Sequence, residues 1–150
     1  MSIREIAAET SPGVFHAREW GLSVDASIID LLTAEARETD TRRARLCMHP
    51  KDDSLEQQML IVMGNEKPYP PHCHPGKQET LLVVRGSAVH ETYTPDGLII
   101  ERTIVSPNAA LYLNTPAGRW HSLSVTTEWL VFWEIARGPF TPESTVHADW

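Results

Sequence analysis

The sequence predicts a mainly β, single-domain protein whose strands form a sandwich or barrel. After residue 50, short apolar segments alternate with turn residues, which is the pattern of an all-β domain. No helical segments separate these strands, so a doubly wound parallel sheet is excluded. At 150 residues, the chain is long enough to bury a core of its own in one domain.

An extended N-terminal arm is expected over residues 1–24. Pro12 and Gly13 interrupt it, and Phe15 and Trp20 give it apolar points at which to dock. Such an arm could reach the sheet edge of a partner subunit in a homodimer, because an exposed edge needs covering. The alternative is that the arm packs on its own barrel.

Residues 25–50 are expected to hold one short helix and a connecting loop. Apolar residues recur there at helical spacing over residues 27–38. Ser27 can cap this helix, with Asp30 three residues later in a position that resembles a capping box. The stripe should pack against a sheet, and its members are Ile28, Ile29, Leu32 and Ala36.

The barrel is expected over residues 51–140, with an irregular C-terminal tail over residues 141–150. Thr94-Pro95-Asp96-Gly97 predicts a hairpin turn, because Pro presets φ and Gly tolerates a positive φ. The segment 79–85 is almost continuous in Leu and Val, so we expect both of its faces to be covered. The expected strands are residues 55–63, 72–74, 79–85, 87–94, 98–105, 110–113, 119–125 and 128–135.

Four residues have the spacing of a metal site. His72 and His74 are two residues apart, so on a strand their imidazoles point to the same side. Glu79 follows a Pro-Gly turn and can fold back toward this pair. His121 would arrive from a distant strand after a second turn. Three imidazoles and one carboxylate suit a divalent transition metal.

The neighbours of these residues have simpler interpretations. Cys73 lies between the two histidines and must face away from them on a strand, so it is expected to be a small apolar filler. Trp120 should face opposite His121 and form a wall of the fold. Gln57 or Gln58 could hydrogen-bond to the imidazoles and orient them. A bare His-x-His pair recurs by chance, so the prediction depends on all four residues together.

Weaker expectations concern other polar residues. His49 is expected to be an exposed loop residue, with a place at the barrel mouth as the alternative. His90 is expected to be structural. Arg102 and Tyr112 could line the cavity by strand alternation or could face solvent. No role is assigned to the remaining candidates, which are His16, Cys47 and His147.

Charge and composition restrict the partners. The formal net charge is −7, which argues against nucleic-acid binding because phosphate contacts need a basic face. Arg42, Arg43 and Arg45 form one basic cluster, expected to be a solvated segment, with a phosphate site as the minority alternative. The chain shows no secretory apolar region, no apolar run of membrane length and only two cysteines. We therefore expect no membrane partner and a reduced, cytoplasmic location.

The ligand spacing resembles the two motifs of the cupin superfamily. The resemblance implies a double-stranded β-helix, a jelly-roll type of barrel, spanning about residues 55–136. It also supports the four predicted ligands as one metal centre. The matching motifs are His72-x-His74-x4-Glu79-x6-Gly86 and Pro116-x-Gly118-x-x-His121.

A closer resemblance covers most of the chain after residue 25. The chain is similar to the WbuC-type cupin fold metalloproteins, whose genes often lie near those for surface-polysaccharide biosynthesis. The resemblance implies fold and metal, and a link to polysaccharide metabolism, without fixing a reaction. The supporting segments are Cys47-Met48-His49-Pro50, Gln57-Gln58-Met59-Leu60, Pro71-His72-Cys73-His74, Trp120-His121 and Gly138-Pro139-Phe140.

Three functions fit these observations. The first is a metal-dependent isomerase, epimerase or lyase acting on a sugar or a similar small polar substrate. The second is an Fe(II)-dependent dioxygenase. The third is a non-catalytic module that binds a metal and a small molecule. Ligand type alone does not choose among Fe, Mn, Ni, Co and Zn.

Overall fold

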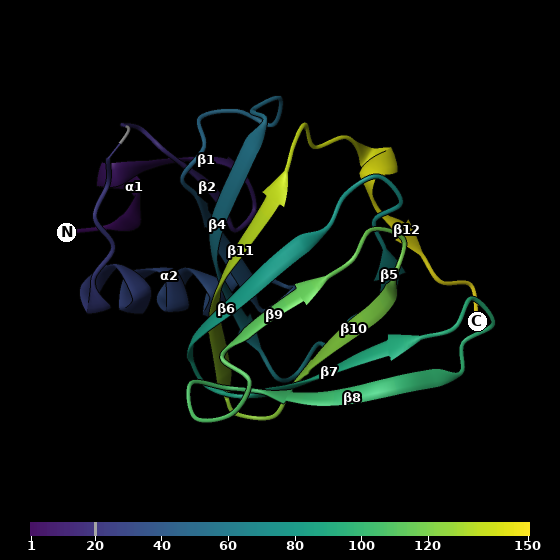
Figure 1. Ribbon diagram of the computed structural model, residues 1–150. Helices are drawn as coiled ribbons and strands as arrows, with labels where there is room; N and C mark the ends of the chain where they lie inside the picture. Colours follow the sequence, from purple (N-terminus) through teal and green to yellow (C-terminus); the bar gives the residue numbers. More distant parts are fainter. Residues whose placement is uncertain (20) are drawn as a thin grey trace.

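The computed structural model describes residues 1–19 and 21–150 and contains two β-sheets packed face to face (Figure 1). The seven-stranded sheet has the order β1-β2-β3-β4-β11-β6-β9, and the five-stranded sheet has the order β12-β5-β10-β7-β8. The strands are β1 Ala7–Ser11, β2 Val14–Ala17, β3 Arg43–Cys47, β4 Glu56–Gly64, β5 Tyr69–Cys73, β6 Glu79–Arg85, β7 Ala88–Tyr93, β8 Ile99–Val105, β9 Tyr112–Thr115, β10 Trp120–Val125, β11 Trp129–Arg137 and β12 Val146–His147.

The mainly β class expected from the sequence is confirmed. Within residues 1–19 and 21–150, the strands are accompanied by two α-helices, α1 (Ile3–Ile6) and α2 (Ala26–Glu38), and one 3₁₀ turn (Pro142–Ser144). In the described part of the chain, no helix is long and apolar enough to cross a membrane.

Helix α2 begins after Asp25, so the cap predicted at Ser27 is wrong. The Asp25 carboxylate accepts hydrogen bonds from the backbone N–H groups of Ser27 and Ile28 at 2.9 and 3.2 Å. It thereby satisfies two donors that have no partner inside the helix. The Ser27 hydroxyl donates to the same carboxylate oxygen, so Ser27 supports the cap.

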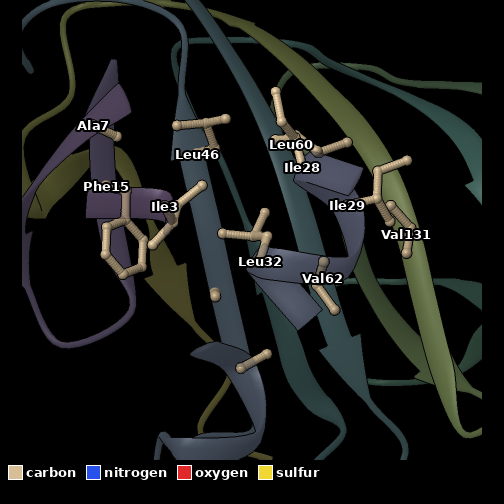
Figure 2. Close-up of a cluster of buried hydrophobic side chains, with 12 residues drawn as sticks. Ile3, Ala7, Phe15, Ile28, Ile29, Leu32, Leu46, Leu60, Val62 and Val131 are labelled. Carbon is tan, nitrogen blue, oxygen red and sulfur yellow. The ribbon is translucent and has the colours of Figure 1, made fainter. Parts of the chain in front are cut away.

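Helix α2 packs on the outer face of the seven-stranded sheet (Figure 2). All four residues of its predicted apolar stripe are buried, which confirms the predicted packing. Three side chains from the N-terminal segment close one end of this outer core. The sheet and the N-terminal segment contribute Ala44, Leu46, Leu60, Val62, Val131, Ile3, Ala7 and Phe15.

A second core lies between the two sheets. Alternate residues of each central strand face opposite sides, so β4 sends Leu60 and Val62 toward α2 and Met59, Ile61 and Met63 toward the inner space. The same division explains why β11, which pairs with β4, is apolar on both faces, with Val131 in the outer core and Leu130 and Phe132 in the inner one. The other sheet meets them with Ala88, Val105 and Leu123.

The N-terminal arm extends the sheet of its own chain. It contains α1 and the antiparallel hairpin β1–β2, and β2 pairs in parallel with β3, placing Phe15 opposite Leu46. The described part of the arm therefore follows the alternative in which it packs on its own barrel. Trp20, the second expected docking point, lies outside the described residues. The connecting loop expected up to residue 50 contains β3, a strand that sequence reasoning did not predict.

The C-terminal tail is more ordered than expected. Val146 and His147 form β12, which pairs with Cys73 and His72 of β5. The prediction of an irregular tail is therefore wrong for these residues, because β5 would otherwise leave an edge of unpaired backbone groups. This pairing carries the tail directly past the predicted metal ligands.

The inner strands lie close to their predicted positions. The turn predicted at residues 94–97 joins β7 and β8. Its Gly97 has a φ of 88°, and its N–H donates to the Thr94 carbonyl at 3.0 Å. The strand expected over residues 110–113 is found two residues later, as β9.

Replacing Leu32 with Ala should lower the free energy of unfolding by about 2–5 kcal/mol, because the buried side chain would leave a cavity. Urea denaturation of the two proteins measures the difference. Leu98→Ala is the matched control, since that side chain is 65% exposed and its loss should cost less than about 0.5 kcal/mol. Equal losses in the two variants would contradict the position of the outer core.

Candidate metal centre

The structure brings the four predicted ligands together at one point between the sheets. The β5–β10 register places His72 opposite His121, and His74 follows one residue after β5 ends. The turn after His74 then crosses from the smaller sheet to the larger, where Glu79 begins β6. One ligand atom from each of the four residues lies within 4.8 Å of all the others.

Glu79 lies between two of the imidazoles. Its Oε1 is 2.9 Å from His121 Nε2, and its Oε2 is 2.9 Å from His74 Nε2. Two atoms bound at a right angle to one ion, each about 2.1 Å away, would be about 3.0 Å apart. The donor atoms present therefore fit a divalent ion, with Glu79 supplying the negative charge.

Backbone carbonyls fix the orientation of all three imidazoles. The Nδ1 atoms of His72, His74 and His121 lie 2.9 Å from the carbonyl oxygens of Pro70, Ser144 and Arg119, respectively. A ring that donates its Nδ1–H to a carbonyl keeps its Nε2 lone pair free for a metal. The chain thus presets the ring orientation that metal binding requires, and the Nε2 protons that His74 and His121 donate to Glu79 would leave when a metal binds.

The predicted orienting role of Gln57 or Gln58 is wrong. Gln57 points inward, but its amide donates to the Asp52 carbonyl at 2.7 Å and braces a loop. Gln58 is exposed. Backbone carbonyls near the imidazoles perform this task, and they leave no signature in the sequence.

Burial and the carboxylate set the charges at the centre. Desolvation lowers the pKa of His72 to about 3, and the neighbouring His121 lowers it further. Desolvation also acts to lower the pKa of His74, but the hydrogen bond and charge of Glu79 outweigh it and raise that pKa. Burial opposes ionisation of Glu79, yet hydrogen bonds from His121 and His74 hold its pKa well below the usual range.

The four residues line a cavity of about 630 Å³, a volume suited to a small-molecule ligand. Part of its wall is apolar, with Met59, Ile61 and Phe132 among the lining residues. Charged side chains also line the cavity, so the wall can distinguish polar groups on a ligand. Two of these charged residues are Arg45 and Glu134.

The prediction of a solvated basic cluster is wrong for Arg43 and Arg45. They alternate with buried apolar residues of β3, so their side chains turn inward and line the cavity. Arg42 instead lies at the surface, where it pairs with Glu66 at 2.8 Å. The alternation of arginine with apolar residues was the available sequence signal for this strand.

Glu134 is a functional candidate that sequence reasoning missed. It is the one acidic residue within β11 and lines the same cavity as the four predicted ligands. Burial raises its pKa to about 7, the charge of Glu79 acts in the same direction, and Arg45 opposes both. A carboxyl with such a pKa can hold or release a proton near neutral pH.

Of three residues with weaker functional expectations, one lies inside the barrel and two lie at its surface. His90 is buried, stacks on His121 at a ring-centroid distance of 5.6 Å and lies 3.3 Å from Thr115 Oγ1. Arg102 and Tyr112 face solvent, which is the alternative given for them: Arg102 pairs with a surface glutamate, and Tyr112 is exposed.

The expectation of an exposed loop position is wrong for His49. This residue is buried and lines the cavity, as in the alternative reading. Cys73 is also buried and is absent from the cavity lining in the described part of the chain, which agrees with a filler role. Trp120 contacts Trp150 away from the metal ligands.

Solved structures define the class of this fold. The chain is similar to CapF (TM-score 0.63, 18% identity, covering 84% of this chain and 41% of CapF). It is also similar to Lactobacillus farciminis oxalate decarboxylase (0.55, 15%, 73% and 32%) and to protein SO0799 from Shewanella oneidensis (0.56, 11%, 64% and 63%). It spans less than two thirds of each of these proteins. The predicted cupin jelly-roll fold is confirmed.

Within this fold class, the sequence belongs to a particular family. Residues 24–105 match the family described as a domain of unknown function, DUF6016, and the chain is a member of it. Comparison with curated proteins finds no match. The closer resemblance to the WbuC-type proteins stays a prediction.

The metal-free protein should lose stability as the pH falls from about 6.5 toward 4. Burial lowers the pKa of His90 to about 4, His121 lowers it further and Glu79 opposes both. Between these pH values the unfolded chain binds a proton that the folded chain resists, so stability rises with pH. His72 contributes with the same sign.

In His90→Gln, the slope of the unfolding free energy against pH should decrease by up to about 1.4 kcal/mol per pH unit. Urea denaturation in the presence of a chelator measures this slope. Asn108→Gln, at an exposed residue without a titrating group, is the control and should retain the wild-type slope. A wild-type slope in His90→Gln would contradict the prediction.

Removing residues 141–150 should weaken metal binding about 10- to 100-fold, since the Ser144 carbonyl then no longer orients His74. Calorimetric titration measures the affinity, and circular dichroism verifies the fold. Removal of residues 148–150 alone is the control, because it deletes Trp150 but keeps β12 and Ser144. If both truncated proteins bind metal equally well, the orienting role of the tail is refuted.

Proposed function

We propose that this protein is a mononuclear divalent-metal cupin that acts as an enzyme on a sugar or a similar small polar substrate. His72, His74, Glu79 and His121 hold the metal in this proposal. The observation that carries it is the convergence of their ligand atoms within 4.8 Å on the wall of a cavity large enough for a small molecule. When bound, the ion would polarise a carbonyl or hydroxyl oxygen of the substrate.

The metal-ligand set leaves the choice of ion open among Fe, Mn, Ni, Co and Zn. Its donors are nitrogen and oxygen atoms only, a set that can hold manganese or iron as well as zinc, with geometry and metal availability deciding among them. Oxalate decarboxylase from Bacillus subtilis, similar in fold (TM-score 0.51, 20% identity), contains Mn(II) centres. This favours manganese as the first ion to test.

The charged residues of the cavity support a polar substrate. Arg45 faces the interior without a salt bridge in the described part of the chain, so its guanidinium is free to bind an anionic or hydroxyl-bearing group. Glu134 lines the same space. A carboxyl that can take up or release a proton suits an isomerase, epimerase or lyase, because each of these reactions moves a substrate proton.

The proposed link to surface-polysaccharide metabolism has a separate basis. It depends on the similarity to the WbuC-type proteins, while the metal centre depends on the ligand geometry. The homodimer also stays a prediction. The arm that was expected to reach a partner pairs with β3 of its own chain.

Purified Glu79→Gln should lose one equivalent of metal per chain relative to wild type, because the change removes the one carboxylate among the four proposed ligands. Elemental analysis without added chelator gives the stoichiometry. Glu134→Gln is the matched control: it removes a second carboxyl from the cavity and should keep the metal. Equal metal content in Glu79→Gln and wild type would refute the proposed centre.

Turnover separates the possible activities of the loaded protein. Sugars and sugar acids are first screened as ligands: those that bind should stabilise the metal-loaded protein against heat. Each ligand found is then incubated with the protein, and the products are analysed. Conversion that continues without oxygen and is lost in Glu134→Gln supports the proposed reaction class. Conversion that requires oxygen assigns a dioxygenase instead, and stabilisation without product assigns a binding module.

A further inference from the structure

We propose a second transition-metal site, formed by His16, Cys47 and His49 with Asp52 as the fourth ligand. One ligand atom from each of the first three residues lies within 4.8 Å of the other two, and all three are buried. These residues line the same cavity as the first centre but share no ligand with it. The site would take zinc or a similar thiolate-binding ion.

Strand pairing brings the first two ligands together. In the parallel β2–β3 pair, His16 lies opposite Cys47, so their side chains project to the same face of the sheet. The preceding pair, Phe15 and Leu46, faces the outer core, which leaves His16 and Cys47 on the cavity side. His49 follows Cys47 by two residues and also lines the cavity.

Backbone contacts leave one nitrogen free on each imidazole. His16 Nδ1 lies 3.2 Å from the carbonyl oxygen of His49. His49 Nδ1 lies 3.2 Å from the backbone nitrogen and 3.3 Å from the carbonyl oxygen of Gln58. In His16, Nε2 is therefore the atom available to a metal, as at the first centre. In His49, Nε2 is available in the tautomer whose Nδ1–H donates to the Gln58 carbonyl; the alternative tautomer accepts the Gln58 N–H at Nδ1 and carries its proton on Nε2.

Asp52 lies beside His16, next to the three-residue cluster. Its Oδ1 is 3.7 Å from His16 Nε2, which is too far for a hydrogen bond. Two ligands of a tetrahedral ion with bonds of about 2.1 Å are about 3.4 Å apart. The Asp52 carboxylate lies outside the group of ligand atoms that are within 4.8 Å of one another, so its exposed side chain would have to turn toward Cys47 and His49 to complete the shell. The loop is held in place because the Asp52 carbonyl accepts hydrogen bonds from Gln57 Nε2 and from the Phe140 N–H at 2.7 and 2.8 Å.

The ligand types distinguish this site from the first. One thiolate, one carboxylate and two imidazoles neutralise a divalent ion and fill a tetrahedral shell, which is the pattern of a structural zinc site. Thiolate selects zinc over manganese or magnesium. Without metal, burial raises the pKa of the Cys47 thiol to about 12, so metal binding would release the thiol proton to solvent. Bound zinc would tie β2, β3 and the following loop together.

Cobalt(II) substitution tests this site independently of the first. A thiolate bound to Co(II) produces a sulfur-to-metal charge-transfer band in the near ultraviolet, and the four-residue centre contains no sulfur ligand. The chain has only two cysteines, so Cys73→Ser is the matched control. We expect the band in wild type and in Cys73→Ser, and its loss in Cys47→Ser together with one equivalent of zinc.

The double variant His72→Ala, His74→Ala separates the two proposals. It should lose the metal of the first centre and keep the charge-transfer band. A cobalt-loaded wild type without the band would overturn the second site, and so would a band that persists in Cys47→Ser. Neither result would affect the first centre, which elemental analysis of Glu79→Gln tests.

Asp52→Asn provides a variant outside the core, because that side chain is 69% exposed. It should weaken Co(II) binding, measured by titration of the band, at least about tenfold. Circular dichroism verifies that it folds, which keeps the test valid if Cys47→Ser does not fold. Unchanged affinity in folded Asp52→Asn would overturn the four-ligand site.

Discussion

The two-residue repeat of the seven-stranded sheet is the constraint on which the rest of this structure depends. Both faces of its central strands are covered, one by α2 and the other by the second sheet. Each inward position must therefore hold either an apolar side chain or a polar side chain whose burial is compensated by a partner or a ligand. Arg45, Glu79 and Glu134 occupy such positions. For Arg45 and Glu134, the outer core fixes this direction, because Leu46 and Trp133 on the same strands pack in it.

Buried charge at the centre is stabilised locally. Glu79 is held ionised by two imidazoles, and backbone carbonyls hold the rings in place. Leaving any of these groups unpaired in the interior would cost more than the hydrogen bond itself contributes. The arrangement therefore exists before metal arrives, and binding requires little reorganisation of the chain.

The sequence predicted the parts of the site that depend on local spacing. His72 and His74 share a strand face, and a turn returns Glu79 to them, so spacing alone indicated their convergence. The same reasoning failed where a residue depends on a distant partner. Arg45 turns inward because β3 pairs with β4, and His16 meets Cys47 only through a parallel pairing across about thirty residues. Ser144 acts through its carbonyl, which every residue type possesses.

The hydrogen bond from His74 to the Ser144 carbonyl connects a predicted ligand to the 3₁₀ turn just before β12, the last strand of the chain. Coupling of this kind is reciprocal. If the docked tail makes the free energy of metal binding more favourable, bound metal stabilises the docked tail by the same amount. The loaded and empty proteins would then differ in how firmly the C-terminal end is held. A partner that captured β12 would sense the metal content of the barrel and, by the same free energy, change it.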